Sequence, residues 1–247
     1  MTFDQQISWE TKGFVVIEDA LSSEELARAR SAFDREIENL RPDWKPPESK
    51  PNDRRIHIPD PLDVDDIFVD LADHPNLLPV VRGAIGDDLV LVFVQAFAYP
   101  PGEGSFTNWH SDLGHVVGLD HTTCIFLARM IIYLEDVSPD GGCFAYVPGS
   151  HKLDLETILR GPWCEETQKR PDSVSFPGKA GTAILFNAYG WHTALPNTSD
   201  SERKALQYGY CHGWVQFFGK AARPKRTEEL ATSDLRKQLF GIRMPWE

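Results

Sequence analysis

The feature that most constrains the fold is a change of pattern near residue 88. From there to residue 215 the chain carries short runs rich in β-branched and aromatic residues, with Gly, Pro, Asn and Asp between them. Such runs predict strands joined by turns. We expect strands over residues 88–99, 125–135, 142–147, 182–187 and 203–215.

The first 87 residues carry mainly helical signals. A β-branched run at 14–17 predicts one short strand. After it, residues 22–40 place Leu26, Phe33, Ile37 and Leu40 at helical spacing, as on a helix with one buried face. Ser22 and Glu25 have the spacing of a capping box, which marks the start of that helix. Shorter helices are predicted over 63–73, 76–86 and 227–240.

Residues 41–63 contain six prolines, which predict a long polar loop without regular structure. Long loops in compact domains are often functional lids. A plain surface connection fits this composition equally well, so both interpretations stay open.

Helical signals followed by many strands predict a mainly β fold, a sandwich or barrel with helices packed outside it. The 247 residues fit one domain of this kind. We expect an N-terminal strand–helix–loop region over 1–87, a β core over about 88–215 and a C-terminal extension over 216–247.

Composition narrows the partners. A net charge of −12 repels phosphate backbones, so nucleic acid is not expected as a partner. No apolar run approaches the ~20 residues needed to cross a bilayer, and the N-terminus lacks a signal-peptide pattern. The four cysteines form no CxxC pair. We expect a cytoplasmic protein with reduced thiols and a small-molecule substrate; oligomeric state cannot be read from the sequence.

Three residues form a candidate metal site. His110 and Asp112 lie in NWHSDLGH, and His192 lies in NAYGWHTALPN. Two imidazoles and one carboxylate make the facial triad of non-haem iron oxygenases, which leaves coordination positions open for other ligands. In an extended segment residues i and i+2 point the same way, so His110 and Asp112 can converge. An HxD pair alone is a weak signal.

Arg203 strengthens this hypothesis. It begins an alternating strand, and its own face carries only small or neutral side chains, namely Ala205, Gln207, Gly209 and Cys211. Such a face leaves room for a ligand, and an arginine at its end can bind a carboxylate through two parallel hydrogen bonds. A surface salt bridge is the alternative for Arg203 taken alone.

Arg129 lies in an otherwise apolar strand, where burial without a partner would be costly. If its face points into the barrel, it is a candidate to bind a substrate carboxylate or phosphate, or to be a second anchor for a cosubstrate. A structural ion pair carries equal weight. Phe106 and His115 are further candidates for substrate contacts. Trp109 and Trp191, each next to a metal-site histidine, are expected to pack behind the site.

Several segments together resemble the phytanoyl-CoA dioxygenase family. They are GFVVIEDALSSEEL, WHSD, DGGCFAYVPGSHK and HTALPNTSDSER, in that order. The resemblance implies a double-stranded β-helix, the cupin-like jelly roll. It also implies an enzyme that uses Fe(II), 2-oxoglutarate and O₂, with His110, Asp112 and His192 as the iron ligands.

The same resemblance implies roles for residues that bind the cosubstrate. Arg203 matches the arginine that binds the far carboxylate of 2-oxoglutarate. Gln95 and Tyr99, on the strand before the metal motif, match positions of polar cosubstrate contacts. One departure is Ala194, where relatives often have serine or threonine; the neighbouring Thr193 is expected to point elsewhere.

The expected reaction is therefore hydroxylation of an unactivated C–H bond in a small metabolite or natural-product intermediate, with release of succinate and CO₂. Because Asp112 is present, halogenation is disfavoured. Two alternatives remain: a metal-dependent hydrolase or isomerase on a cupin-like barrel, and a metabolite-binding module without activity. Arg203 favours the oxygenase over the first, and the intact triad argues against the second.

Overall fold

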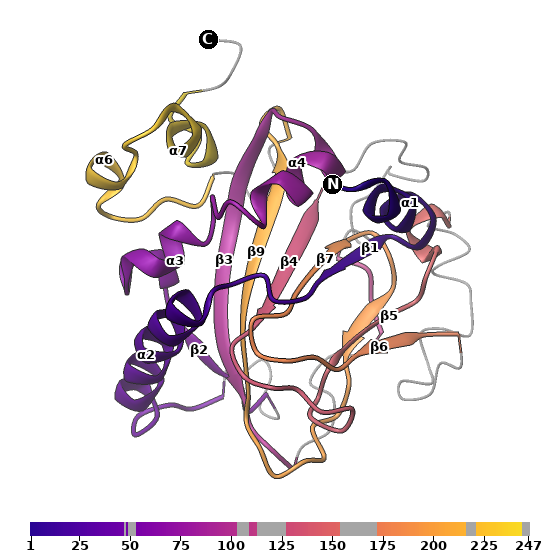
Figure 1. Cartoon of the computed structure of the whole chain (residues 1–247). Coiled ribbons are helices and arrows are strands. Elements are labelled where there is room, and N and C mark those ends of the chain that lie inside the picture. The colour runs from indigo at the N-terminus through magenta and orange to yellow at the C-terminus, as the bar shows by residue number, and fades with distance from the viewer. Residues whose placement is uncertain are drawn as a thin grey trace.

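The strands form two antiparallel sheets in a computed structural model that describes residues 1–46, 48, 53–102, 109–112, 127–153, 172–215 and 221–243 (Figure 1). The larger sheet has the strand order β1-β7-β4-β9-β3-β2, and the smaller has β6-β5-β8. The strands are β1 Phe14–Ile17, β2 Ile56–Ile58, β3 Leu89–Tyr99, β4 Ala128–Tyr133, β5 Phe144–Tyr146, β6 Val174–Phe176, β7 Ala183–Asn187, β8 His192–Ala194 and β9 Arg203–His212.

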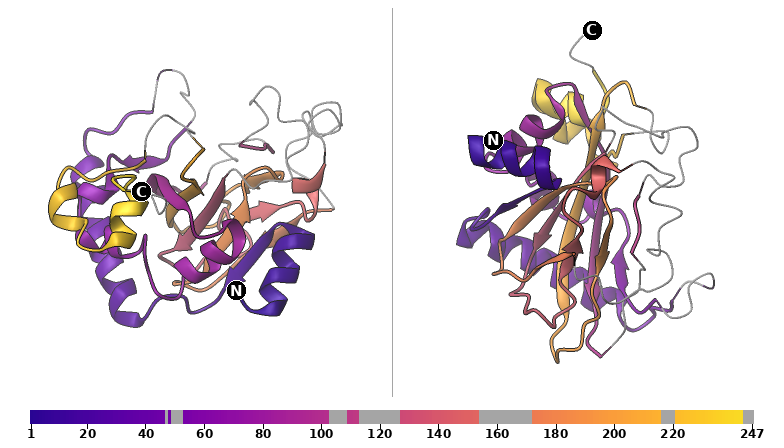
Figure 2. Two further views of the ribbon diagram at one scale, coloured as in Figure 1. Left: turned by 90° about the horizontal axis from the view of Figure 1, so that it is seen from above. Right: turned by 90° about the vertical axis from the view of Figure 1, so that its right-hand side faces the viewer.

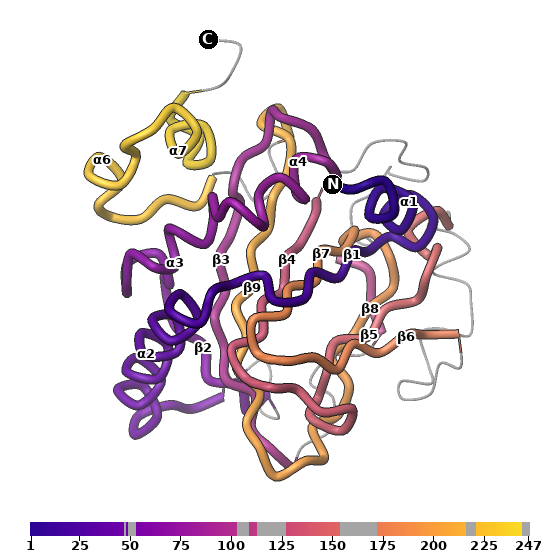
Figure 3. Tube along the Cα trace, in the orientation of Figure 1, coloured from indigo at the N-terminus to yellow at the C-terminus, as the bar shows by residue number. Residues whose placement is uncertain are grey.

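Helices cover one face of the larger sheet, and the smaller sheet lies across its other face, as the turned views of Figure 2 and the trace of Figure 3 show. The expected jelly roll with helices outside it is confirmed. The helices are α1 Phe3–Lys12, α2 Ser23–Leu40, α3 Asp66–Asp70, α4 Leu78–Ile85, α6 Thr227–Leu230 and α7 Asp234–Leu239, with short 3₁₀ helices η1 Pro61–Asp63 and η2 Ser150–Lys152. No helix in these described ranges is long and apolar enough to cross a membrane.

Strand β9 separates the two faces by strict alternation. Tyr208 and Tyr210 point to the helices, where their hydroxyls donate to the backbone carbonyls of Phe68 and Ala72, both at 2.9 Å. Arg203 and Gln207 point the other way, into the space between the sheets. The alternation expected for this strand is therefore confirmed, and it fixes which of its side chains can reach a ligand.

A β-bulge in β3 changes which of its residues face the site. Leu91 pairs with Tyr210 of β9, but the next aligned pair is Phe93 with Gly209, so Val92 is an extra residue. Before the bulge, Leu91 packs against the helices; after it, even-numbered residues such as Ala96 do. Gln95 therefore points into the space between the sheets.

Some expected boundaries are wrong. The 41–63 segment, expected to be irregular, contains η1 and the edge strand β2, which pairs with β3. It forms because Ile56 and Ile58 are buried and no proline interrupts 53–58. Helix α1 was missed although Thr2 and Gln5 form a capping box and Gly13 ends it. The short strands β6 and β8 were missed too. The expected helix 227–240 is two helices, because Ser233 caps a new one.

Helix α2 begins as the sequence predicts, and its cap can be tested. The Ser22 hydroxyl accepts from the Glu25 backbone N–H at 3.2 Å, and the Glu25 carboxylate accepts from the Ser22 N–H at 2.8 Å. Ser22→Ala should lower the free energy of unfolding by about 1 kcal/mol, a fall in Tm of roughly 2–4 °C by calorimetry. Ser23→Ala, at the first exposed helical position, is the matched control and should change little. Equal melting of both variants would contradict the capping role.

Candidate metal centre

His110, Asp112 and His192 converge at one end of the space between the sheets. One ligand atom from each lies within 4.8 Å of the others. The Nε2 atoms of His110 and His192 lie 3.5 and 3.6 Å from Asp112 carboxylate oxygens. The expectation that these residues meet although they are far apart in the chain is confirmed.

The backbone holds the three residues together. His110 and His192 form an isolated antiparallel bridge, with N–H···O distances of 3.1 and 2.9 Å. The Asp112 N–H donates to the Ala188 carbonyl at 3.0 Å. His192 also begins β8, which pairs with β5 opposite Tyr146. All three side chains are therefore tied to the turn between β7 and β8.

The His192 ring is oriented as a metal ligand requires. Its Nδ1–H donates to the Gly190 carbonyl at 2.8 Å, which leaves the Nε2 lone pair free. Nε2 is buried, and no described residue gives it a hydrogen-bond partner. Burial, together with the nearby His110, lowers the pKa of His192 to about 3, so the ring is neutral. A buried nitrogen acceptor beside a second imidazole and a carboxylate is the donor set that suits ferrous iron.

Asp112 is fixed by an arginine. Its Oδ2 accepts from Arg129 Nη1 at 2.6 Å, and both side chains are largely buried. Burial by itself would raise the pKa of the Asp112 carboxyl, but the charge of Arg129 and the two imidazoles together outweigh it. The pKa lies well below its usual range, and the group is ionised as a metal ligand must be.

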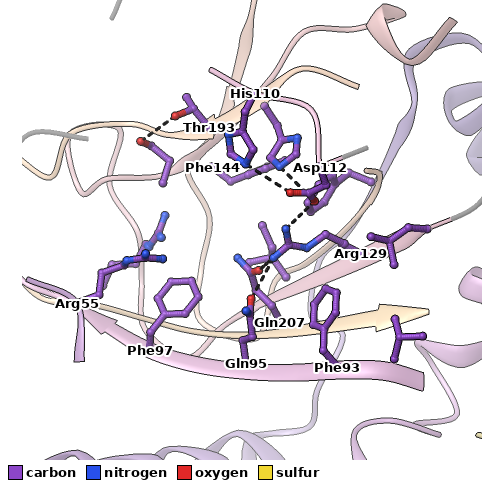
Figure 4. A pocket seen from close by; sticks show the side chains of 17 residues that line it. Arg55, Phe93, Gln95, Phe97, His110, Asp112, Arg129, Phe144, Thr193 and Gln207 are labelled. Atoms are coloured by element: carbon purple, nitrogen blue, oxygen red, sulfur yellow. Dashed lines mark hydrogen bonds and ion pairs between the residues drawn. The ribbon is translucent and has the colours of Figure 1, made fainter. Parts of the chain in front are cut away.

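Arg129 points into the barrel, one of the two possibilities left open by the sequence. Its guanidinium lies 5.0 Å from the ring centroid of Phe93 and 5.7 Å from that of Phe186. Nη2 donates to the side-chain oxygens of Gln95, at 3.2 Å, and Gln207. Figure 4 shows the guanidinium between Asp112 and these two glutamines. Arginine, two amides and a metal ligand thus form one connected network.

A cavity of about 600 Å³ lies beside this network. Its lining includes the metal triad, Arg129, Gln95, Gln207 and the rings of Phe93, Phe97, Phe144 and Phe186. Thr193, expected to point elsewhere, lines it together with Ala194. A volume of this size suits a small organic molecule.

Arg203 lies at the border of the same cavity and is only 5% exposed. Its guanidinium lies 5.1 Å from the Tyr99 ring centroid, and Nη1 donates to the Gly142 carbonyl. No carboxylate among the described residues pairs with it, and its Nε has no partner there. Burial lowers the pKa of Arg203. A buried guanidinium without a counter-ion is a strong candidate to bind an anion.

The remaining expected residues take different places. The Tyr99 ring packs against the Arg203 guanidinium, and Tyr99 is not one of the residues that line the cavity. Trp109 and Trp191 lie in an apolar cluster behind the site, as expected. Phe106 and His115 lie outside the described residues.

Two polar cavity residues were not predicted as site residues. Gln207 shares the face of Arg203 in the sequence pattern, a usable signal. Arg55, the residue directly before β2, reaches the cavity and pairs with Asp53 at 2.8 and 2.6 Å. It lies in the segment expected to be a loop, so nothing in the sequence placed it at the site.

Comparison with known proteins identifies relatives of the chain. The family model described as phytanoyl-CoA dioxygenase (PhyH) matches residues 9–205. "Dioxygenase af480" of Aspergillus fumigatus is 26% identical over 160 residues, 64% of this chain and 48% of that protein, so the chain matches about half of that relative's length. A "probable alpha-ketoglutarate-dependent hypophosphite dioxygenase" of Stutzerimonas stutzeri is 25% identical over 237 residues, covering 85% of this chain and 78% of that protein.

Solved structures share the fold. HygX of Streptomyces hygroscopicus, determined with nickel and 2-oxoglutarate bound, superposes with a TM-score of 0.67 at 22% identity and covers 90% of each chain. At this identity the likeness supports the jelly-roll architecture.

The pairing of Asp112 with Arg129 predicts that a metal ligand also stabilises the metal-free fold. In protein stripped of metal with a chelator, Asp112→Asn should lower the free energy of unfolding by about 3 kcal/mol, because it leaves a buried guanidinium without its carboxylate. The double variant Asp112→Asn/Arg129→Met should recover much of that loss. Urea unfolding measures all three proteins.

The control is Asp136→Asn, which breaks an exposed pair with Lys179 and should change stability little. If metal-free Asp112→Asn unfolds at the same urea concentration as the parent protein, the pair does not contribute to stability.

Proposed function

The chain belongs to the phytanoyl-CoA dioxygenase family and is an Fe(II)- and 2-oxoglutarate-dependent dioxygenase, and we propose that it hydroxylates a C–H bond of a small organic molecule bound in the cavity beside the metal centre. The observation that carries the proposal is that one cavity holds a metal triad and a buried arginine, Arg203, for which the described residues offer no carboxylate partner. A site that only binds a metal would not need the arginine, and a structural salt bridge would not need the metal triad.

His110, Asp112 and His192 are the residues that would hold iron. Bound iron supplies the activation of O₂ that is coupled to decarboxylation of 2-oxoglutarate to succinate and CO₂. The chain's own residues supply geometry. The Gly190 carbonyl fixes the His192 tautomer, Arg129 fixes the Asp112 carboxylate, and the rings of Phe144 and Phe186 pack beside the His192 ring, with centroids at 5.8 and 4.8 Å.

Arg203 is the proposed partner of the far carboxylate of 2-oxoglutarate. Its burial beside the Tyr99 ring and the missing carboxylate partner both support this role. Arg55 and Arg203 lie over the same Phe97 ring, at 5.4 and 5.9 Å, and because Asp53 balances Arg55, this end of the cavity carries about one net positive charge, that of Arg203. A dicarboxylate cosubstrate fits that charge.

Known relatives support a small-molecule substrate. Curated relatives are named for hypophosphite, ectoine and phytanoyl-CoA, and solved structures of the same fold hold hygromycin B or nogalamycin RO. These compounds range from an inorganic anion to an acyl-CoA and share only that each is a small molecule and not a macromolecule. The relatives therefore support a small-molecule substrate but do not identify which one.

The decisive test is turnover of the cosubstrate. Fe(II)-loaded protein should convert 2-oxoglutarate to succinate, faster when a substrate panel is present, and should develop a metal-to-2-oxoglutarate absorption band under anaerobic conditions. A band without succinate formation would favour a metabolite-binding module. Hydrolysis or isomerisation without need of a 2-oxo acid would favour the other alternative.

Arg203 gives a sharper prediction. Arg203→Ala should raise the Kd for 2-oxoglutarate, measured by anaerobic titration of that band, by more than about tenfold, because a buried ionic partner is lost. Arg203→Lys should recover part of the affinity, since it keeps the charge but loses the two-pronged geometry. Arg28→Ala, on the exposed face of α2, is the control. An unchanged Kd in Arg203→Ala would remove this residue from the cosubstrate site.

A further inference from the structure

Two glutamines lie side by side on the cavity floor. Gln95 of β3 and Gln207 of β9 are direct partners in the antiparallel register, so their side chains leave the sheet on the same face. Both line the cavity. The side-chain oxygens of both accept from the same atom, Nη2 of Arg129 on β4.

This shared contact fixes which way the two amides point. Arginine has only donors, so it can bind only the oxygen of a carboxamide. The shapes of an amide oxygen and an amide nitrogen are too similar to orient a glutamine. Here the contact with Arg129 sets the orientation of each amide. With both oxygens on Arg129, the amide nitrogens of Gln95 and Gln207 point away from it. Neither nitrogen has a hydrogen-bond partner among the residues that the structure describes.

Arg129, which orients the two amides, is itself held in place, while Gln95 is exposed to solvent. Arg129 is held by Asp112 at 2.6 Å and by the faces of two aromatic rings, so it cannot easily turn to release the amides. Gly209, opposite Arg129 in the register, has no side chain that could displace Phe93; a Cβ there would lie 2.4 Å from the Phe93 ring. Donors held in place before binding lose little entropy when an acceptor arrives.

The charges around the cavity favour an anion as that acceptor. Arg129 is balanced by Asp112, and Arg55 by Asp53, whereas no carboxylate in the described part of the chain pairs with Arg203. A divalent metal and a doubly negative cosubstrate cancel each other. The one positive charge left among the described cavity residues is that of Arg203, the proposed partner of the cosubstrate, so beside the glutamines the acceptor would meet N–H donors with no net negative charge.

We propose that the amide groups of Gln95 and Gln207, oriented by Arg129, bind the carboxylate of the primary substrate, so that the enzyme acts on small carboxylic acids. The inference rests on the proposed function. The sequence resemblance implied that Gln95 contacts the cosubstrate. The present proposal assigns Gln95 to the substrate instead. Gln95 lies about 13 Å along β3 from Tyr99, at the far side from Arg203.

The experiment compares matched probes on the metal-loaded enzyme. Anaerobic protein with Fe(II) and 2-oxoglutarate is titrated with phenylacetate, phenylacetamide and phenethylamine, and with hexanoate, hexanamide and hexylamine. Binding is followed by calorimetry and by the change in the metal-to-2-oxoglutarate band. Each acid should bind about tenfold more tightly than its amide, and more tightly still than its amine.

The variant Gln95→Met/Gln207→Met removes the donors while keeping side-chain length. It should weaken the binding of acids at least about tenfold and leave the Kd for 2-oxoglutarate unchanged. Gln6→Met, on the exposed helix α1, is the matched control. Gln207→Glu alone provides a second variant, which should also weaken the acids because it places a negative charge on the floor.

Each other outcome overturns the assignment. Amines binding as tightly as acids, or no acid binding at millimolar concentration, would exclude a carboxylate site. If the double variant lost affinity for 2-oxoglutarate but still bound the acids, the amides of Gln95 and Gln207 would bind the cosubstrate and not the substrate. Absence of the absorption band in the parent protein, read before any acid is added, would instead contradict the proposed function.

Discussion

The pairing of Asp112 with Arg129 is the interaction on which the site depends. It joins the metal ligand Asp112, which lies outside the strands, to Arg129 of β4 in the middle of the larger sheet. It also keeps the Asp112 carboxylate ionised inside the barrel. The same guanidinium orients two amides on the cavity floor. One charged group thereby sets both the charge of the metal centre and the polarity of the surface that faces it.

The sequence was sufficient for residues whose pattern is local or whose chemistry is rare. Alternation in β9 placed Arg203 and Gln207 on one face, and the capping box of Ser22 marked the start of α2. The triad was predictable because Arg203 and several family-like segments accompany the HxD pair, which alone is a weak signal. The strand face of Arg129 was visible too, but whether that face pointed inward depended on the packing of the second sheet.

Features that depend on register were not predictable. The family resemblance placed Gln95 at the site, but no composition signal marks the extra residue Val92, which sets the face that Gln95 takes. The edge strand β2, which brings Arg55 to the site, consists of three residues after a proline-rich stretch. Short strands of this kind form because a neighbouring strand offers hydrogen bonds, so the information for them lies in the neighbour.

The bridge between His110 and His192 has a mechanical consequence. His192 belongs to the smaller sheet through β8, whereas Asp112 is anchored to the larger sheet by Arg129. A metal ion bound by His110, Asp112 and His192 would therefore link the two sheets of the jelly roll. Loading the metal and keeping the layers from sliding apart become one event, and slow amide hydrogen exchange in β5 and β8 would report its occupancy.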